Sequence, residues 1–167
     1  MKSISRKIIL LGDFAVGKTS TVARSVRNTF SDTYLTTVGV RVDSKAMAID
    51  DDLHLRMVLW DIAGANTLDQ LRSNYVMGAQ GILLVADGTR EDTVDTALEL
   101  REQAWRLLGR EVPVVLMLNK SDLADAWAIS QDRIRELQAQ LPTFTASAKT
   151  ATGVEEAFAA LARELLP

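Results

Sequence analysis

The stretch GDFAVGKT has the residue types and spacing of a phosphate-binding loop. It fits the pattern G-x-x-x-x-G-K-[ST] and lies between an apolar strand-length run and a helical pattern, which is the context the motif requires. The glycines let backbone amides approach phosphates, Lys18 reaches the terminal phosphates, and the Thr19 hydroxyl is a ligand for Mg²⁺. The predicted phosphate-binding residues are Gly12, Asp13, Phe14, Ala15, Val16, Gly17, Lys18, Thr19 and Ser20.

A second candidate site lies in the stretch WDIAG, which follows a predicted strand. The carboxylate of Asp61, at the end of a neighbouring strand, can hold Mg²⁺, and Gly64 can give its amide to a terminal phosphate. By itself the pattern D-x-x-G is weak, because an aspartate at a strand end often serves only as a cap. Its position after a phosphate-binding loop favours the functional interpretation.

Two later motifs predict a binding site for guanine. In NKSD, which spans Asn119, Lys120, Ser121 and Asp122, the carboxylate of Asp122 can accept hydrogen bonds from N1–H and the 2-amino group of guanine. Adenine offers no such pair of donors, so the motif favours guanine over adenine. In SAK, which spans Ser147, Ala148 and Lys149, a backbone amide would lie near the guanine carbonyl and the lysine over the ring.

These four motifs, in this order along the whole chain, resemble those of the Ras superfamily of small GTPases. The stretch VMGAQGILLVADGTRED with NKSD most resembles the Rab branch and its bacterial relatives. The resemblance implies that Phe30 packs on the guanine and that Tyr34 and Thr37 close over the γ-phosphate. It implies that the Thr37 hydroxyl joins Thr19 and Asp61 as a metal ligand only in the GTP state. Lys18, Thr37 and Gly64 are the catalytic residues that it implies.

The resemblance also implies a function, a set of ligands and a set of partners. The chain would bind GTP or GDP with Mg²⁺ and hydrolyse GTP slowly, and release of the two switch loops would follow loss of the γ-phosphate. Protein effectors, an activating protein or an exchange factor would bind at those loops. A rival hypothesis remains open: a GTP-binding interaction module with little or no turnover.

The sequence departs from the family at two positions that bear on hydrolysis. Most relatives have a water-orienting glutamine where this chain has Ala65, and a methyl group cannot hydrogen-bond a water molecule. Phe14 stands where relatives have glycine or another small residue, and its ring would crowd a side chain that reaches toward the γ-phosphate; alternatively, it packs outward against the second switch loop. Asn66, Gln70 or a partner protein could replace the missing glutamine. Both departures predict a low intrinsic rate.

The elements that must position these motifs are an alternation of strands and helices. Unbroken apolar runs at residues 8–11, 82–86 and 112–118 are typical of buried parallel strands, and a short strand is expected at residues 143–146. The alternation of apolar residues between Val40 and Trp60, around an acidic turn at residues 50–52, predicts a hairpin and one antiparallel edge strand. With the resemblance, this predicts a three-layer α/β/α fold of the P-loop NTPase type, with a six-stranded mixed, mostly parallel sheet and five helices.

Two of the helices are legible from their apolar spacing. One should run from about Val94 to Leu108 and end at Gly109. The other lies near the C-terminus, where Thr152 and Glu155 have the spacing of a capping box. The alternation runs from end to end, so residues 1–167 are expected to form a single G domain.

Composition narrows the setting in which this domain works. With 167 residues, a net charge of −3 and no cysteine, the chain shows no electrostatic drive toward nucleic acid and no side chain to lipidate. No apolar run is long enough for a membrane span. We therefore expect a cytoplasmic protein, monomeric in isolation and without a lipid anchor. The chain ends with its last helix, so either it is a bacterial-type switch or it is a piece of a longer protein.

Overall fold

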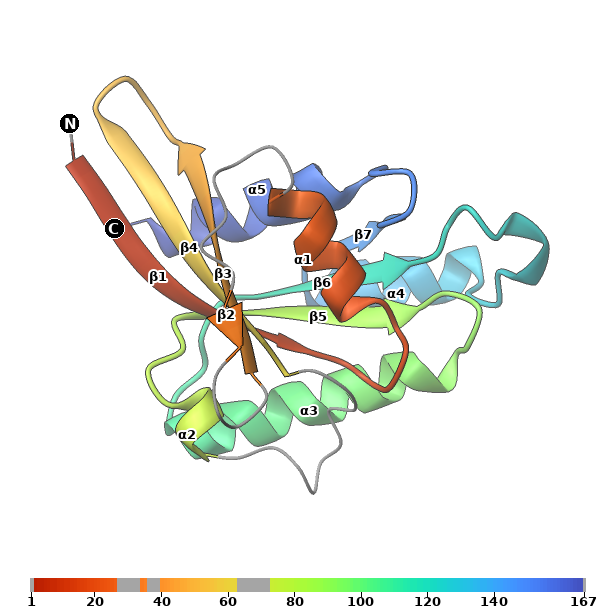
Figure 1. The fold of residues 1–167 in the computed structure, drawn as a ribbon. Coiled ribbons are helices and arrows are strands. Elements are labelled where there is room, and N and C mark those ends of the chain that lie inside the picture. The colour runs from red at the N-terminus through yellow and green to blue at the C-terminus, as the bar shows by residue number, and fades with distance from the viewer. Residues whose placement is uncertain (1, 27–33, 36–39, 63–72, 167) are drawn as a thin grey trace.

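The computed structural model describes residues 2–26, 34–35, 40–62 and 73–166, and Figure 1 shows their arrangement. In the described part of the chain, one sheet has the strand order β2-β3-β4-β1-β5-β6-β7. The strands are β1 (Lys2–Leu11), β2 (Tyr34–Leu35), β3 (Val40–Ala48), β4 (Leu53–Ile62), β5 (Gly81–Asp87), β6 (Val114–Asn119) and β7 (Thr143–Thr145). The predicted six-stranded mixed sheet is present, and the two-residue β2 extends it at the outer edge of β3.

Most neighbouring strands in the sheet are parallel. β1 pairs in parallel with β4 and β5, and the parallel order continues through β6 to β7. The predicted hairpin is β3 and β4, which are antiparallel from Val40 opposite Ile62 to Ala48 opposite His54. β1, β4, β5 and β6 all run in the same direction, so their carboxyl ends lie at one edge of the sheet.

The described residues form four helices of nine residues or more and the single turn α2 (Ser73–Val76). The longer helices are α1 (Lys18–Val26), α3 (Asp92–Leu108), α4 (Gln131–Gln140) and α5 (Val154–Leu165). A short 3-10 helix spans Ala124–Ala126. The predicted end of α3 is confirmed, since Gly109 adopts the left-handed conformation at φ 73° and its amide bonds to the Arg106 carbonyl.

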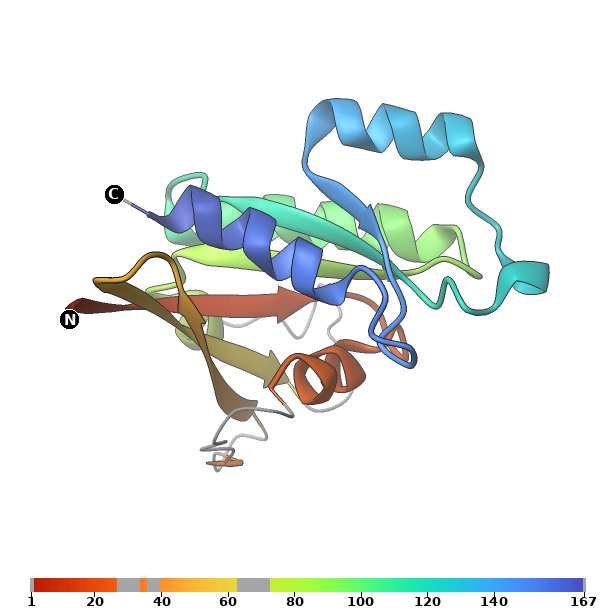
Figure 2. The same ribbon diagram turned by 90° about the horizontal axis from the view of Figure 1, so that it is seen from above.

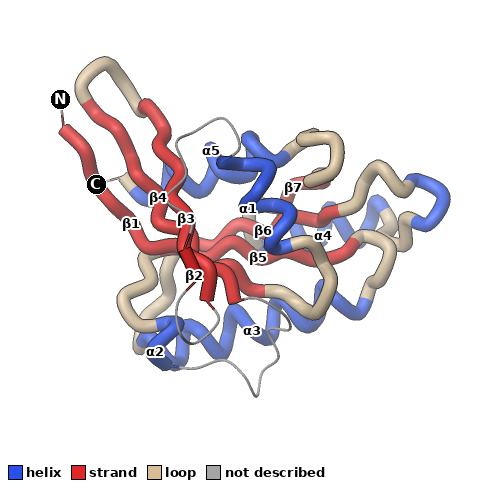
Figure 3. Tube along the Cα trace, in the orientation of Figure 1, coloured by secondary structure: helices blue, strands red, loops and turns tan. Residues whose placement is uncertain are grey.

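Helices cover both faces of the sheet and make the three layers visible in Figures 2 and 3. One core cluster joins a face of the sheet to apolar residues of α2, α3 and α4, and the other joins the opposite face to α1 and α5. β5 is buried along its whole length, as are residues 8–11 of β1, which explains why these segments appear in the sequence as unbroken apolar runs. None of the helices in the described ranges combines the length and apolar character needed to cross a membrane.

Two local expectations were wrong. β1 begins at Lys2 rather than Ile8, because its first half extends past the helices, pairs with β4 alone and is more exposed and polar. The capping box at Thr152 does not form: Gly153, at φ 74°, precedes α5 and makes no side-chain cap. The Thr152 hydroxyl instead lies 2.9 Å from that of Thr150.

Candidate functional site

The loop between β1 and α1 forms a small pocket at the carboxyl edge of the sheet. This pocket of about 380 Å³ is lined by Phe14, Ala15, Val16, Gly17, Lys18, Thr19, Ser20 and Lys120. A Cβ atom added at Gly12 would lie 2.4 Å from the Val85 carbonyl oxygen. At Gly17, where φ is +104°, it would lie 2.2 Å from Asn119 Nδ2. Both glycines of the motif are therefore required by close packing of the loop against β5 and β6.

Lys18, the first residue of α1, folds back over this loop. Its buried ammonium donates to the carbonyl oxygens of Gly12 at 3.0 Å and Asp13 at 3.3 Å. Burial lowers the pKa of Lys18, and the charges of Asp61 and Asp13 act in the opposite direction. The positive charge of Lys18 and the amino end of α1 therefore face the same pocket, which is suited to an anion.

Asp61, near the end of β4, meets the loop through a hydrogen bond. The Thr19 hydroxyl donates to its Oδ2 at 2.7 Å, while its Oδ1 is buried without a hydrogen-bond partner among the described residues. Burial raises the pKa of Asp61, and the hydrogen bond from Thr19 and the charge of Lys18 lower it. A hydroxyl and a carboxylate with one unpartnered oxygen fit Mg²⁺, which binds few protein oxygens and takes its other ligands from phosphates and water.

A larger pocket lies beside the first. It has a volume of about 760 Å³ and is lined by Gly17, Ser20, Ala23, Arg24, Asn119, Lys120, Asp122, Leu123, Ala148 and Lys149. The two pockets share Gly17, Ser20 and Lys120, so they form one continuous cleft. A cleft with a cationic end and a wider end matches the outline of a nucleotide.

Asn119, the last residue of β6, connects the two ends of this cleft. Its Nδ2 donates to the Val16 carbonyl at 2.9 Å, and its Oδ1 accepts from the Ala148 amide at 2.9 Å. In the loop after β7, Ser147 Oγ donates to Asp122 Oδ1 at 2.8 Å and fixes the orientation of that carboxylate. The motifs NKSD and SAK are therefore held together by hydrogen bonds between their own side chains.

The structure brings together most of the residues predicted for the site. Residues 14–20 line the smaller pocket, and Asp61 bonds to Thr19 beside it. Asn119, Lys120, Asp122, Ala148 and Lys149 line the larger one. Phe14 stands at the rim with its side chain 60% exposed. Phe30, Thr37, Gly64, Ala65, Asn66 and Gln70 lie outside the described residues. The backbone of Tyr34 lies in β2, opposite Val42 of β3.

The four sequence motifs include none of three residues that support the site: Arg24, Asp87 and Arg90. Arg24 of α1 donates to the carbonyl oxygens of Ala148 at 2.8 Å and Lys149 at 2.7 Å. Arg90 and Lys120 both contact Asp87 Oδ2, at 3.0 and 2.8 Å. Burial would raise the pKa of Asp87, but hydrogen bonds from Lys120, Thr89 and Arg90 outweigh it and lower the pKa to about 2. No sequence motif signals these roles, because each arginine acts on backbone carbonyls far away along the chain.

Comparisons with known proteins agree across almost the whole chain. A sequence model of the Ras family matches residues 7–167. The chain is 32% identical over 161 residues to Ras-related protein Rab-1D of Dictyostelium discoideum, covering 95% of this chain and 78% of the relative. It is 34% identical over 162 residues to Ras-related protein Rab-1 of Theileria parva, covering 95% of this chain and 73% of the relative.

Proposed function

Because the chain belongs to the Ras family, we propose that its cleft holds one guanine nucleotide with Mg²⁺. The chain is a Rab-like small GTPase, a GTP-binding molecular switch. The observation that carries the proposed placement is a pair of hydrogen bonds at the Asn119 side chain: it donates to the Val16 carbonyl and accepts from the Ala148 amide, and so links the smaller pocket to the larger one. The phosphates occupy the end beside Lys18, and the base occupies the end beside Asp122.

The wider end of the cleft selects guanine. Asp122, oriented by Ser147, accepts from N1–H and the 2-amino group of the base. The Ala148 amide already donates to Asn119, so the next amide, that of Lys149, is the donor for the guanine carbonyl. Arg24, which binds the carbonyls on both sides of that amide, keeps it in place.

The narrow end holds the phosphates and the metal. Backbone amides of the loop bind the phosphate oxygens, and Lys18 releases the carbonyls of Gly12 and Asp13 to contact them. Thr19 and Asp61 would hold Mg²⁺, and Thr37 would join them in the GTP state, as the family resemblance implies. When bound, the metal neutralises charge on the phosphates. Thr37 and Gly64 would contact the bound Mg²⁺ and γ-phosphate and so couple the conformation of the switch segments to the nucleotide state. Effectors, an activating protein or an exchange factor bind at these segments.

We propose that the chain hydrolyses GTP slowly, because Ala65 cannot orient the attacking water. Phe14 lies at the rim of the narrow pocket with most of its ring exposed, where it meets any side chain that approaches the γ-phosphate from outside. These two residues also favour the second candidate function, a GTP-binding interaction module with little or no turnover. The rate of GTP hydrolysis separates the two.

Three further expectations stay proposals. Residues 1–167 form one G domain, since both core clusters draw on strands along most of the chain. The setting is cytoplasmic, and the protein is monomeric on its own. The prokaryotic type inferred from the sequence gains no support from the two relatives named above, which come from Dictyostelium and Theileria.

Equilibrium titration with GDP, ADP and xanthosine diphosphate in the presence of Mg²⁺ tests the placement of the base. GDP should bind at micromolar concentration or tighter and ADP far more weakly, because adenine lacks the donors that Asp122 accepts. Asp122→Asn should weaken GDP and favour the xanthine nucleotide, whose extra carbonyl accepts from the new amide. Ser121→Ala, next to it in the same motif, is the matched control. Equal binding of ADP and GDP by the unmodified chain would contradict the proposal.

A further inference from the structure

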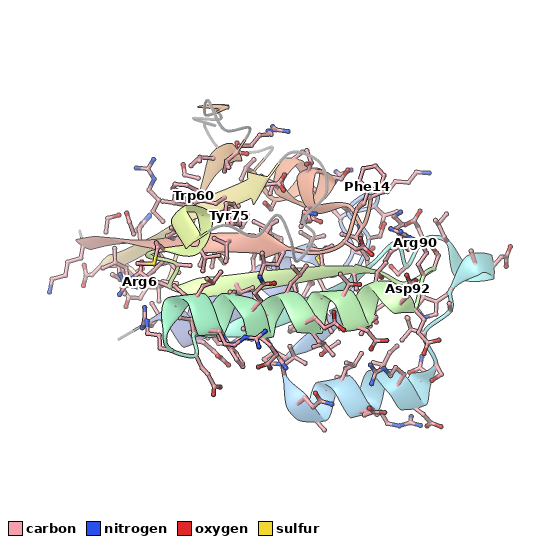
Figure 4. The ribbon with its side chains drawn as sticks, turned by 90° about the horizontal axis from the view of Figure 1, so that it is seen from below. Arg6, Phe14, Trp60, Tyr75, Arg90 and Asp92 are labelled. Atoms are coloured by element: carbon pink, nitrogen blue, oxygen red, sulfur yellow. The ribbon has the colours of Figure 1, made fainter. Side chains whose placement is uncertain are left out.

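Side chains from outside the phosphate-binding loop hold three consecutive carbonyl oxygens of that loop. They are the oxygens of Phe14, held by Arg90 Nη2 at 2.7 Å, of Ala15, held by Lys120 Nζ at 2.9 Å, and of Val16, held by Asn119 Nδ2 at 2.9 Å. Lys120 and Asn119 belong to a motif already assigned to the site. Arg90 does not, and it lies in the turn between β5 and α3, where Figure 4 shows it beside Phe14.

A held carbonyl fixes the direction of the amide that follows it. In a planar trans peptide the C=O and the next N–H point in opposite directions. When Arg90, Lys120 and Asn119 pull the three carbonyls outward, the amides of the next three residues face the other side, toward the narrow pocket that these residues line. Among the described residues these amides, those of Ala15, Val16 and Gly17, donate no hydrogen bond within the chain.

Arg90 itself is held in place by a buried carboxylate. Its Nε contacts Asp87 Oδ2 at 3.0 Å, and the Asp87 side chain is only 2% exposed. Asp87 Oδ1 accepts from the amide and hydroxyl of Thr89, so the carboxylate is fixed on both oxygens. Asp87, at the end of β5, therefore restrains the guanidinium that donates to the Phe14 carbonyl. The Arg90 side chain loses little further entropy when it forms this hydrogen bond.

The loop needs such support, because part of its backbone is strained. Ala15 has φ +59°, a left-handed conformation that is unfavourable for a residue with a Cβ. A strained residue keeps its conformation only when its neighbours over-determine it. Here the peptide before Ala15 is held by Arg90 and the peptide after it by Lys120.

We propose that Arg90 is a positioning residue for diphosphate binding. Anchored by Asp87, it holds the Phe14 carbonyl so that the Ala15 amide faces the phosphates. This inference rests on the proposed function, since it requires that the narrow pocket receive the phosphates. Arg90 does not contact the nucleotide itself. Its loss changes the direction of one amide that binds the β-phosphate side of the ligand and leaves the pocket of the base untouched.

The test compares GDP with GMP on the full chain in Mg²⁺, by competition against a fluorescent GDP. GMP keeps the base but lacks the phosphate that the loop surrounds, so each variant's GMP affinity measures how well its base pocket is folded. Arg90→Gln should weaken GDP about tenfold, the loss expected for one charge-assisted hydrogen bond, and leave GMP unchanged. Arg133→Gln is the matched control, because Arg133 also pairs with two carboxylates, Asp95 and Glu136, but contacts no carbonyl of the loop.

Arg90→Lys provides a rescue. Lys120 shows that one ammonium can contact both Asp87 and a loop carbonyl, so lysine at position 90 should restore most of the GDP preference. An unchanged GDP affinity in Arg90→Gln would overturn the inference, as would an equal loss of GDP and GMP, or a lysine variant as weak as the glutamine variant. Failure of the unmodified chain to bind GDP would instead overturn the proposed function.

Discussion

At the scale of single residues, the buried carboxylate of Asp61 is the group that points to a bound cation. The residue is 1% exposed, one of its carboxylate oxygens accepts from Thr19, and the other has no hydrogen-bond partner within the described ranges. A buried carboxylate in this condition is costly unless a positive charge lies beside it. Lys18 supplies part of that charge, and the proposed Mg²⁺ supplies the rest.

Replacing Asp61 by asparagine keeps the shape of the side chain and removes its charge. In the presence of Mg²⁺, GDP should dissociate from Asp61→Asn roughly 10- to 100-fold faster than from the unmodified chain. The variant binds Mg²⁺ more weakly, so the metal no longer helps to hold the phosphates. Removing Mg²⁺ with a chelator should speed release from the unmodified chain and change the variant little. The readout is the dissociation rate of a fluorescent GDP, with Asp95→Asn, an exposed carboxylate of α3, as control. Equal chelator sensitivity in both proteins would rule out Asp61 as a metal-holding residue.

The residue scale also shows which parts of the site the sequence could predict. Gly12, Gly17 and Lys18 were predictable, because phosphate binding fixes their types and spacing within one short loop. Arg24 and Arg90 were not, because what matters is the backbone carbonyl that each one reaches, and carbonyls are the same at every residue. Only the folded chain brings such partners together.

At the scale of elements, α1 joins the two ends of the cleft. It begins at Lys18 beside the phosphate pocket, and six residues later its Arg24 reaches the loop after β7. The helix therefore positions the guanine-binding loop as well as the phosphate-binding one. A substitution in α1 can therefore change the affinity for the base, although the sequence motif at the start of this helix binds phosphate.

Arg24→Gln tests this role of α1. Loss of the two hydrogen bonds to Ala148 and Lys149 should weaken GDP binding by about 2 kcal/mol, roughly thirtyfold in Kd. The reason is that the amide proposed to donate to the guanine carbonyl loses its support. GMP should weaken by the same factor, in contrast to Arg90→Gln, since the base pocket is shared by both ligands. Arg6→Gln is the control: Arg6 lies on β1 (Figure 4), and the one hydrogen bond that it donates among the described residues goes to the carbonyl of its neighbour Ser5. A variant that kept full affinity for GMP would show that Arg24 does not position the base.

Element boundaries were predictable where burial is uniform and unpredictable where it changes along an element. The buried strand β5 and the helix α3 appear in the sequence as a continuous run and a regular spacing, and both lie where they were expected. β1 extends six residues further toward the N-terminus than its apolar run, because that half pairs with β4 without a covering helix. The start of α5 follows the left-handed Gly153 rather than the side-chain cap that Thr152 suggested.

At the scale of the whole molecule, the fold places every described motif of the site at one edge of one sheet. The carboxyl ends of β1, β4, β5 and β6 lie at that edge because these strands run in the same direction (Figure 3). Alternation of strands and helices was enough to predict this arrangement. The expected roles of Thr37, Gly64 and Ala65 in the two nucleotide states stay predictions, because residues 36–39 and 63–72 lie outside the described residues.

The rate of GTP hydrolysis in a single turnover tests the central claim, that this chain is a slow guanine-nucleotide switch. The unmodified chain with Mg²⁺ should hydrolyse GTP on the order of 10⁻⁴ per second or more slowly, the range of a Ras-type enzyme without an activating protein. Ala65→Gln should raise the rate modestly, and adding Phe14→Gly should raise it more than the two single changes combined, since both act on one site. If the unmodified chain alone reached several turnovers per second, the range of an arginine-assisted enzyme, and neither change mattered, another residue would position the water and the account of Phe14 and Ala65 would be wrong.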